Sequence, residues 1–336
     1  MKILRLNSDT FPMTPQELRE YERAVIEVVR RETVNESQDD GLLRDLDALA
    51  IVSAKVGGSL IKRLEKCKVI SRYGSGTDNI DVPSATSCAI VVTNVPDFCL
   101  SEVADHTMAL MLGLARKLLI MDRSTRAGEW QARLNRPVRR IAGRTLGLVG
   151  FGGIAQKVAS RAAAFDLRIV ATDPRLDSAA CARLGVDPVS LPELLELSDF
   201  VSLHVPLLPD TFHLIGEGEL RRMKPSAFLI NTARGAVVDE SALVKALKEG
   251  WIAGAGLDVY EGLAMFDPSP QVPDHPLFKL ENVILTPHSA GCSVDSLEEL
   301  CQRGAQNAVA VLKGRWPLHC VNPAVVPRIS LVGKVG

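Results

Sequence analysis

Short runs rich in β-branched residues alternate with helical stretches along most of this chain, and this alternation constrains the fold more than any other feature. It is typical of βαβ units, in which crossover helices join parallel strands. The runs form two series, so we expect two parallel sheets. The first series is Ile3–Leu6, Ala50–Ser53, Val69–Ser71 and Ile90–Thr93. The second is Thr145–Val149, Arg168–Thr172, Phe200–Leu203, Phe228–Asn231, Gly254–Asp258 and Val283–Thr286.

Helix start signals lie between these strands. Thr14 and Glu17 form a capping box around Pro15, and they predict a helix that runs to about Arg31. Ser190 begins a second motif of the same form. The chain is therefore expected to cover both sheets with short, capped helices.

Two longer helices are expected to connect the two halves of the fold. The apolar stretch from Leu100 to about Arg116 predicts a helix that carries the chain from one domain to the other. A last helix over Ser293–Lys313 follows the second series of strands, and we expect it to return to the first domain. Between them, Asp239 and Gly250 are typical of the start and the end of a helix.

Length and composition exclude several classes of protein. With 336 residues, 46% of them hydrophobic, the chain is too long for one compact core and suits two domains. The formal net charge of −1 argues against a nucleic-acid partner, and no apolar run is long enough to span a membrane. Met1–Asn7 is too short and too charged for a signal peptide and predicts a strand instead. Seven cysteines without a CxxC pair predict neither disulfides nor a metal site, and they favour a cytoplasmic location.

A glycine-rich turn follows the strand at 145–149. The segment Gly150–Ala155 reads G-x-G-x-x-A, the alanine variant of the dinucleotide-binding fingerprint. Gly150 permits a tight turn, Gly152 lets backbone approach a pyrophosphate, and the small Ala155 lets helix pack on strand. Asp173 ends the next strand, where an acid would bond the ribose 2′-hydroxyl and repel a 2′-phosphate. These features predict NAD as the cofactor, rather than NADP.

Three charged or titratable residues follow the later strands. Arg234, Asp258 and His288 each come just after a strand of the second series, and in parallel sheets such residues reach the ligand edge. Arginine can hold a carboxylate through two parallel hydrogen bonds, and histidine can exchange a hydroxyl proton near neutral pH. This combination suits the oxidation of an alcohol beside a carboxylate. Of the other histidines, His106 is expected to be packed in its apolar helix and His204 to lie toward the adenine side of the cofactor.

The sequence resembles the D-isomer-specific 2-hydroxyacid dehydrogenase family, which includes phosphoglycerate dehydrogenase and the C-terminal-binding-protein corepressors. The residues that carry the resemblance are Arg72–Asp81, Leu146–Ala155, Asn231–Gly235, Gly256–Tyr260 and Thr286–His288. They occur in the family's order and extend over nearly the whole chain.

The resemblance implies an α/β fold of two doubly wound parallel sheets, with a Rossmann NAD domain at 101–290. This domain is expected to be inserted in a flavodoxin-like substrate domain made from 1–100 and 291–336, in a homodimer. The implied activity is interconversion of a D-2-hydroxy acid and a 2-oxo acid, a small carboxylate substrate, by hydride transfer.

The resemblance also implies site residues. Arg234 would hold the substrate carboxylate, and His288 would be the acid–base residue. The substrate would also meet Tyr73, Gly74, Ser75 and Gly76, since a glycine turn can present several N–H groups to one anion. The expected cofactor contacts are Gly150, Gly152, Gly153, Ile154, Asp173, His204, Pro206, Thr211, Thr232, Ala233, Asp258 and His288.

The sequence departs from the family at one position. The family usually has a glutamate five residues after the strand-end aspartate, where it orients the histidine and raises its pKa, but this chain has Leu263 there. Glu261 or Asp267 could substitute. Without a carboxylate, the pKa of His288 is expected to be lower than in relatives.

Two other functions remain open from the sequence. The missing glutamate is compatible with an NAD-sensing regulatory protein like the corepressors, although Arg234 and His288 argue for an enzyme. The same arginine could also serve a dehydrogenase of another small anion, such as phosphite or formate.

Overall fold

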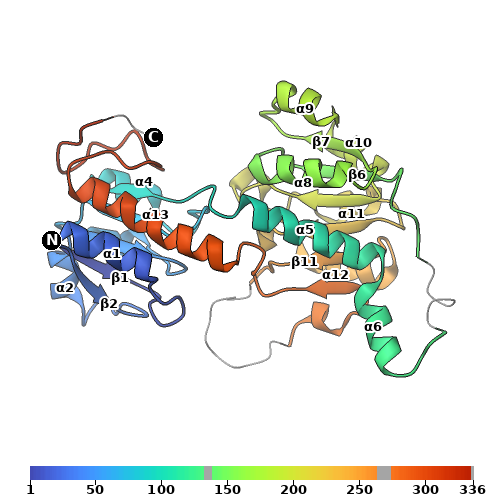
Figure 1. The fold of residues 1–336 in the computed structure, drawn as a ribbon, viewed down its shortest axis with the longest axis horizontal. Coiled ribbons are helices and arrows are strands. Elements are labelled where there is room, and N and C mark those ends of the chain that lie inside the picture. The colour runs from blue at the N-terminus through green and yellow to red at the C-terminus, as the bar shows by residue number, and fades with distance from the viewer. Residues whose placement is uncertain (132–137, 263–273, 334–336) are drawn as a thin grey trace. The chain divides into compact units, whose positions relative to one another are not determined.

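The computed structural model describes residues 1–131, 138–262 and 274–333. The chain divides into two compact units (Figure 1). The first consists of Met1–Phe98 and Ser293–Gly336, and the second of Cys99–Cys292. Both termini therefore belong to one unit, and the second unit is a continuous insertion.

A five-stranded parallel sheet in the order β2-β1-β3-β4-β5 forms the centre of the first unit. This order is that of flavodoxin-like sheets. The long helix α13 packs on α1 and on the three strands β3, β4 and β5. The strands are β1 (Lys2–Arg5), β2 (Glu27–Arg30), β3 (Ala48–Ile51), β4 (Val69–Arg72) and β5 (Val91–Thr93). The helices are α1 (Pro15–Ala24), α2 (Asp40–Asp45), α3 (Gly58–Arg63), α4 (Val82–Ser87) and α13 (Val294–Leu312).

Strand β2 was not expected from the sequence, which predicts a helix to about Arg31. That prediction is wrong after Ala24. Val25 adopts a left-handed conformation (φ 57°), and its N–H donates to the carbonyl of Glu22, which ends the helix. The β-branched run that follows pairs with β1 in parallel register, with Val28 opposite Ile3. Pairing across the sheet therefore overrides a helical pattern that continues through the segment.

A buried ion pair lies in the core of the first unit. Arg5 Nε donates to Glu17 Oε1 at 2.9 Å, and neither side chain is exposed. The guanidinium lies 4.7 Å from the ring centre of Tyr73, whose hydroxyl lies 2.6 Å from that of Tyr21. Burial raises the pKa of Tyr73 well above its usual value. These contacts join β1, α1 and the end of β4 through buried polar groups.

The second unit contains a seven-stranded parallel sheet in the order β12-β11-β10-β9-β6-β7-β8. The strand order reverses between β6 and β9, as in dinucleotide-binding folds. Its strands are β6 (Thr145–Val149), β7 (Arg168–Thr172), β8 (Val186–Pro188), β9 (Phe200–Leu203), β10 (Phe228–Asn231), β11 (Gly254–Leu257) and β12 (Val283–Leu285). Its helices are α5 (Leu100–Ala115), α6 (Leu118–Arg126), α8 (Gly153–Ala163), α9 (Ser178–Leu184), α10 (Leu191–Leu197), α11 (Glu217–Arg222) and α12 (Glu240–Glu249), with the 3₁₀ turns η1 (Pro209–Thr211), η2 (Gly235–Val237) and η3 (Pro276–Lys279).

The sequence predicts most of this unit closely. The strands β6, β7, β9 and β10 have the predicted bounds, and β11 and β12 each end one residue early. Asp239 caps α12 by accepting from the Ala242 N–H, and Gly250 ends that helix in the left-handed conformation (φ 72°). Helix α5 matches the predicted connecting helix and packs on β10, β11 and β12. The short strand β8 was missed, because it contains Asp187 and Pro188 and is largely exposed.

Three further properties concern membrane spans, cysteines and metal sites. None of the described helices is both long and apolar enough to cross a membrane. All seven cysteines are free thiols. Among the described residues, no group of three or more histidine, cysteine, aspartate or glutamate side chains could hold a metal ion.

The buried ion pair predicts a large cost for removing one partner. Glu17→Ala leaves Arg5 charged and buried, which costs about 3 kcal/mol or more and should lower the melting temperature of the first unit by roughly 6–12 °C. Glu217→Ala removes an exposed partner of Arg221 and should shift melting by about 1–2 °C or less. Differential scanning calorimetry distinguishes the two. Equal shifts for both variants would contradict this account.

Candidate functional site

The carboxyl ends of β10, β11 and β12 bring the three predicted residues to one edge of the second sheet. Asn231 at the end of β10 is opposite Leu257 at the end of β11, which is opposite Leu285 at the end of β12. Arg234, Asp258 and His288 follow these three neighbouring strands directly. The loops that carry them therefore lie next to one another.

Asp258 is fully buried and holds the loop that carries His288. Its Oδ1 accepts from the Thr286 hydroxyl at 2.5 Å and from the Ser289 N–H at 2.9 Å, and its Oδ2 accepts from the Ala290 N–H at 2.9 Å. Its backbone carbonyl accepts from the His288 N–H at 2.8 Å. Hydrogen bonds to an ionised buried carboxylate are among the strongest in proteins. One side chain thus fixes the whole turn from Thr286 to Ala290.

His288 itself has a strained backbone. Its φ is 56°, in the left-handed region that costs a non-glycine residue about 1–2 kcal/mol. Such strain persists only where surrounding contacts fix it, and the bonds from Asp258 do so here. The sequence placed Asp258 at the nicotinamide end of the cofactor, and the structure shows that its carboxylate contacts this loop. The groups that bond to the buried Asp258 carboxylate could not be found from the sequence.

The loop after β10 is also fixed by a buried side chain. The Asn231 carboxamide donates to the Arg234 carbonyl at 2.9 Å and accepts from the Ala233 N–H at 3.0 Å. Next to Arg234, a Cβ at Gly235 would collide with the Tyr260 backbone, so only glycine fits. The backbone of Arg234 is therefore held between Asn231 and the neighbouring loop after β11.

The glycine turn between β6 and α8 fits a dinucleotide. Gly150 has φ 90°, and a Cβ there would lie 2.8 Å from the His204 carbonyl oxygen, so the turn packs directly against the loop after β9. A Cβ on Gly152 would meet no atom within 4 Å, and no side chain caps the N-terminus of α8. The N–H groups at Gly153 and Ile154 thus begin an eleven-residue helix beside open space, as pyrophosphate binding requires. Ala155 is fully buried, as predicted for helix packing on the strand.

Asp173 lies just after β7 and next to this turn. Its Oδ2 accepts from the Phe151 N–H at 2.8 Å and its Oδ1 from the Arg175 N–H at 2.7 Å. The carboxylate is only partly buried and keeps further lone pairs for ribose hydroxyls. The acid that the sequence assigned to the ribose is thus attached to the glycine turn itself.

The remaining predicted cofactor contacts lie on neighbouring strand-end loops. The Thr211 hydroxyl in η1 donates to the Pro206 carbonyl at 2.6 Å, which shapes the loop after β9. After β10, the Thr232 hydroxyl lies 3.0 Å from that of Thr107 on α5, beside Ala233. These loops follow β9 and β10, the two strands next to β6 on one side of the switch point.

The predicted substrate turn belongs to the first unit. Gly74 has φ 145°, Ser75 is exposed, and the Asn94 carboxamide donates to the Ser75 carbonyl at 2.7 Å. Gly76 follows, half-buried. The Tyr73 side chain points into the core and has no exposed surface. The Tyr73 side chain therefore packs in the core, and it is the Tyr73 backbone that adjoins Gly74 in the turn.

Glu261, one of the two candidates for the missing glutamate, has another partner. Its Oε1 lies 2.8 Å from His213 Nε2, and its N–H donates to Glu240 Oε2 at 3.0 Å. The other oxygen of Glu240 lies 2.7 Å from His275 Nε2. Glu261 is therefore used to hold its own loop. Leu263 and Asp267 lie outside the described residues.

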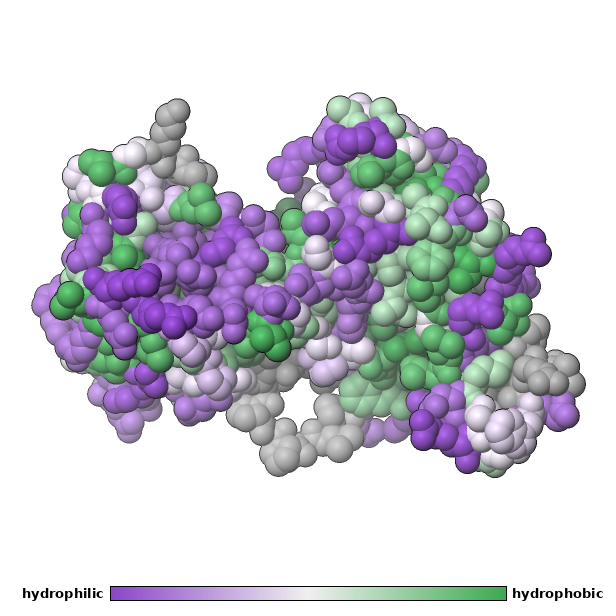
Figure 2. All heavy atoms as spheres, in the orientation of Figure 1, coloured by the Kyte–Doolittle hydropathy of each residue, from purple (hydrophilic) through white to green (hydrophobic). Residues whose placement is uncertain are grey.

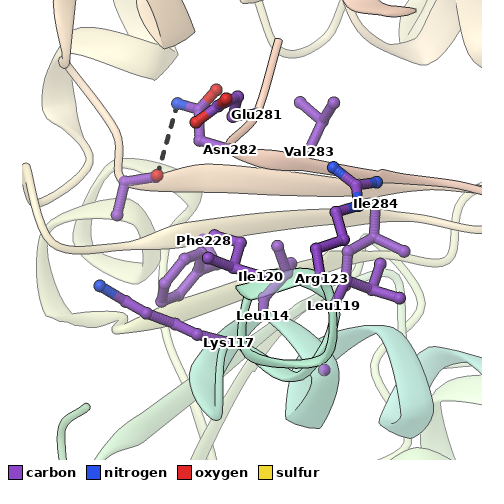
Figure 3. Close-up of a pocket in the computed structure, with 12 residues that line it drawn as sticks. Leu114, Lys117, Leu119, Ile120, Arg123, Phe228, Glu281, Asn282, Val283 and Ile284 are labelled. Atoms are coloured by element: carbon purple, nitrogen blue, oxygen red, sulfur yellow. Dashed lines mark hydrogen bonds between the residues drawn. The ribbon is translucent and has the colours of Figure 1, made fainter. Parts of the chain in front are cut away.

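A pocket of about 150 Å³, which the sequence does not predict, lies at the opposite edge of the second sheet. Phe228, at the start of β10, and Val283, at the start of β12, line it together with Leu114. Figure 3 shows Leu114 and Phe228 between the side chains of Lys117 and Arg123. The pocket adjoins the amino ends of the strands, so it is separate from the strand-end residues described above.

Comparison with known proteins agrees with this geometry. The model of the D-isomer specific 2-hydroxyacid dehydrogenase NAD binding domain matches residues 108–290. The glyoxylate reductase of Korarchaeum cryptofilum is 44% identical over 289 residues, which cover 84% of this chain and 85% of that protein. The crystal structure of a glyoxylate reductase from Paecilomyes thermophila superimposes with a TM-score of 0.84 at 31% identity, covering 96% of this chain and 98% of that one. A D-lactate dehydrogenase from Aquifex aeolicus, complexed with NAD and lactic acid, superimposes with a TM-score of 0.83 at 29% identity, covering 93% and 96%.

The chain belongs to the D-isomer-specific 2-hydroxyacid dehydrogenase family. It is an oxidoreductase that interconverts a 2-hydroxy acid and a 2-oxo acid with a nicotinamide dinucleotide. The matching family model is an NAD binding domain, and the acid at Asp173 suits the free ribose 2′-hydroxyl of NAD. The sequence identified the family correctly. Phosphoglycerate dehydrogenase, named from the sequence as a family member, is a neighbouring branch. Relatives that match this chain at 43–44% identity are named glyoxylate reductase.

His204 of this dehydrogenase is a partly buried histidine with a lowered pKa. Its Nε2 lies 2.9 Å from the Ser202 hydroxyl, and its N–H donates to the Val149 carbonyl at 2.7 Å. Burial lowers the pKa of His204 from 6.5 to about 4. The ring is therefore uncharged at neutral pH, which is compatible with a contact to the cofactor and unsuited to proton exchange there.

The lowered pKa of His204 predicts an acid-sensitive fold. Between pH 6.5 and 4 the unfolded chain binds a proton that the folded chain does not, so His204 stability is full above pH 6.5 and is lost as pH falls toward 4. At pH 4.5 the cost is about 2 kcal/mol, or roughly 4–8 °C in melting temperature. His204→Gln cannot take the proton and should lose less stability than wild type between pH 7 and 4.5. Parallel melting curves for the two proteins would refute this assignment.

Proposed function

We propose that this dehydrogenase reduces glyoxylate, and other small 2-oxo acids, with NADH. The relatives named glyoxylate reductase support the substrate, since they match most of the chain at 40–44% identity. The observation that carries the proposal is the buried Asp258 carboxylate, which holds His288 beside the loop of Arg234. An arginine and a histidine on adjacent fixed loops suit a 2-oxo acid better than an uncharged carbonyl compound.

Arg234 would bind the substrate carboxylate. Its guanidinium stays charged at any working pH and can make two parallel hydrogen bonds to a carboxylate. Its backbone is fixed by Asn231 at 2.9 Å, so the side chain starts from a defined point. Backbone N–H groups of the Gly74–Gly76 turn would bind the same carboxylate from the first unit. We accordingly propose that 1–100 and 291–336 form the substrate domain, and 101–290 the dinucleotide-binding domain.

His288 would exchange the proton. In reduction it would donate to the oxygen of the 2-oxo group, and in oxidation it would accept that proton from the hydroxyl. Bound NADH would supply the hydride to the carbon of the same group. The turn that Asp258 fixes would keep His288 oriented toward that oxygen through the reaction, which avoids the cost of ordering it each time.

Turnover of a 2-oxo acid panel tests these assignments. Purified protein should oxidise NADH with glyoxylate, followed at 340 nm, and NADPH should serve less well because Asp173 repels a 2′-phosphate. His288→Ala should lower kcat by about 10²–10⁴-fold. Arg234→Ala should lower kcat/KM by about 10²–10³-fold, because a carboxylate is left without its charged partner. Arg221→Ala, an exposed arginine on α11, is the matched control and should turn over as wild type.

Two results would overturn the proposal. Wild-type turnover in His288→Ala would remove that residue from the chemistry. Activity with formate or phosphite, and none with any 2-oxo acid, would move the substrate to a different class of anion.

We further propose that the enzyme is a homodimer that joins through the surface formed by α5 and α6. Figure 2 shows apolar side chains grouped around α5 on the second unit. Leu118 and Leu119 begin α6 and are 57% and 43% exposed, and Trp130 is 72% exposed. The pocket of Figure 3 opens beside these residues and could receive apolar side chains of a second copy. Contiguous exposed apolar side chains are typical of protein interfaces.

The seven free thiols support a location in a reducing cytoplasm.

Charge placed on this surface should separate the dimer. Leu118→Asp combined with Leu119→Asp would bury two unpaired carboxylates at the interface, so light scattering should show the mass change from two chains to one. Val326→Asp, at an apolar residue 81% exposed in the first unit, is the control and should leave the mass unchanged. A wild-type monomer, or a double variant that remains dimeric, would contradict the proposed surface.

A further inference from the structure

His106 on α5 contacts the loop that carries His288. The sequence predicts a packed side chain, but the ring is 23% exposed and its Nε2 lies 2.9 Å from the Thr286 hydroxyl oxygen. The same nitrogen lies 3.6 Å from Asp258 Oδ1. His106 therefore forms a polar link between α5 and the turn at the end of β12.

The direction of this link follows from counting protons. The Thr286 hydroxyl has one proton, and Asp258 Oδ1 at 2.5 Å is a much closer acceptor for it than the Leu257 carbonyl at 3.5 Å. The Thr286 oxygen must then accept from His106, so His106 Nε2 carries a proton. The chain of donors runs from His106 through Thr286 to Asp258.

The link from His106 ends on the buried Asp258 carboxylate. The carboxylate has no exposed surface, and a buried charge requires hydrogen bonds or an opposite charge nearby. His106 supports one of these hydrogen bonds, because the Thr286 hydroxyl that donates to Asp258 accepts from it.

We propose that His106 is a positioning residue for the acid–base loop. It donates to the Thr286 hydroxyl oxygen, and Thr286 in turn donates to the Asp258 carboxylate that holds the turn. Without the donor at His106, the Thr286 hydroxyl would be free to turn away from Asp258, and the carboxylate would lose one of its hydrogen bonds to the turn. The turn that holds His288 in its left-handed conformation would then loosen. The inference rests on the proposed role of His288 and makes no use of a contact between His106 and substrate.

Paired substitutions at His106 separate this role from packing. His106→Met keeps the bulk and loses the donor, so kcat should fall about tenfold while KM for glyoxylate, set by Arg234, changes by less than about threefold. His106→Gln can donate from its amide and should stay within about threefold of wild type in kcat. His319→Met is the matched control, since His319 is 29% exposed and lies 3.8 Å from a carboxylate, and it should turn over as wild type.

A double-mutant cycle tests whether the link passes through Thr286. Thr286→Val should lower kcat, Thr286→Ser should restore it, and His106→Met with Thr286→Val should be no slower than the slower single variant. Additive losses in the cycle would overturn the proposal. So would equal kcat in His106→Met and His106→Gln, whether both are normal or both are impaired.

Nitrogen NMR of ¹⁵N-histidine protein checks the link without turnover. The proposal requires His106 Nε2 to be protonated, and a neutral His106 protonated on Nδ1 would overturn it. His288→Ala is assayed in parallel. Normal turnover in His288→Ala would refute the role of His288 while the His106 resonances still report on the link, so the two failures can be distinguished.

Discussion

The buried carboxylate of Asp258 is the interaction on which the strand-end loops of the second unit depend. A charge without exposed surface is stable only when hydrogen bonds replace its water, and here the Thr286 hydroxyl and two N–H groups of the following turn do so. Those bonds leave the turn one conformation, with His288 in the left-handed region. The hydrogen bonds that stabilise the buried Asp258 carboxylate therefore also hold His288 in its strained conformation.

Close packing of neighbouring loops is the second constraint at this edge. Gly235 lies against the Tyr260 backbone and Gly150 against the His204 carbonyl, in both cases closer than any Cβ would allow. The first contact couples the loop of Arg234 to the loop that follows Asp258. The second brings the glycine turn beside the loop after β9, at the point where the strand order reverses. Glycine is needed here because backbone meets backbone, which keeps the loops of both halves of the sheet together.

Helices and strands were predicted well where residues close in sequence determine them. Strands such as Thr145–Val149 and the caps Asp239 and Gly250 follow from neighbours along the chain, so they could be read directly. Strand β2 could not, because its pairing with β1 depends on a contact across the sheet. The same limit applies at the site. Arg234 and His288 were found from their strand-end positions, but the inward orientation of Tyr73 and the partners of Asp258 arise from residues far apart in sequence.

Leu263 stands where the family usually has a glutamate, and the acids near it in the sequence bond to other groups. Glu261 bonds to His213 at 2.8 Å, and Glu240 bonds to His275 at 2.7 Å while accepting from the Glu261 N–H, so these acids hold loop ends. Asp258 bonds to the turn of His288 from the buried side. In relatives with the glutamate, one acid can both orient the histidine and supply charge beside it. In this chain Asp258 can orient His288 instead, because it bonds to the backbone of the turn that carries His288. Thr286 donates to Asp258, and His106 contacts Thr286 in turn.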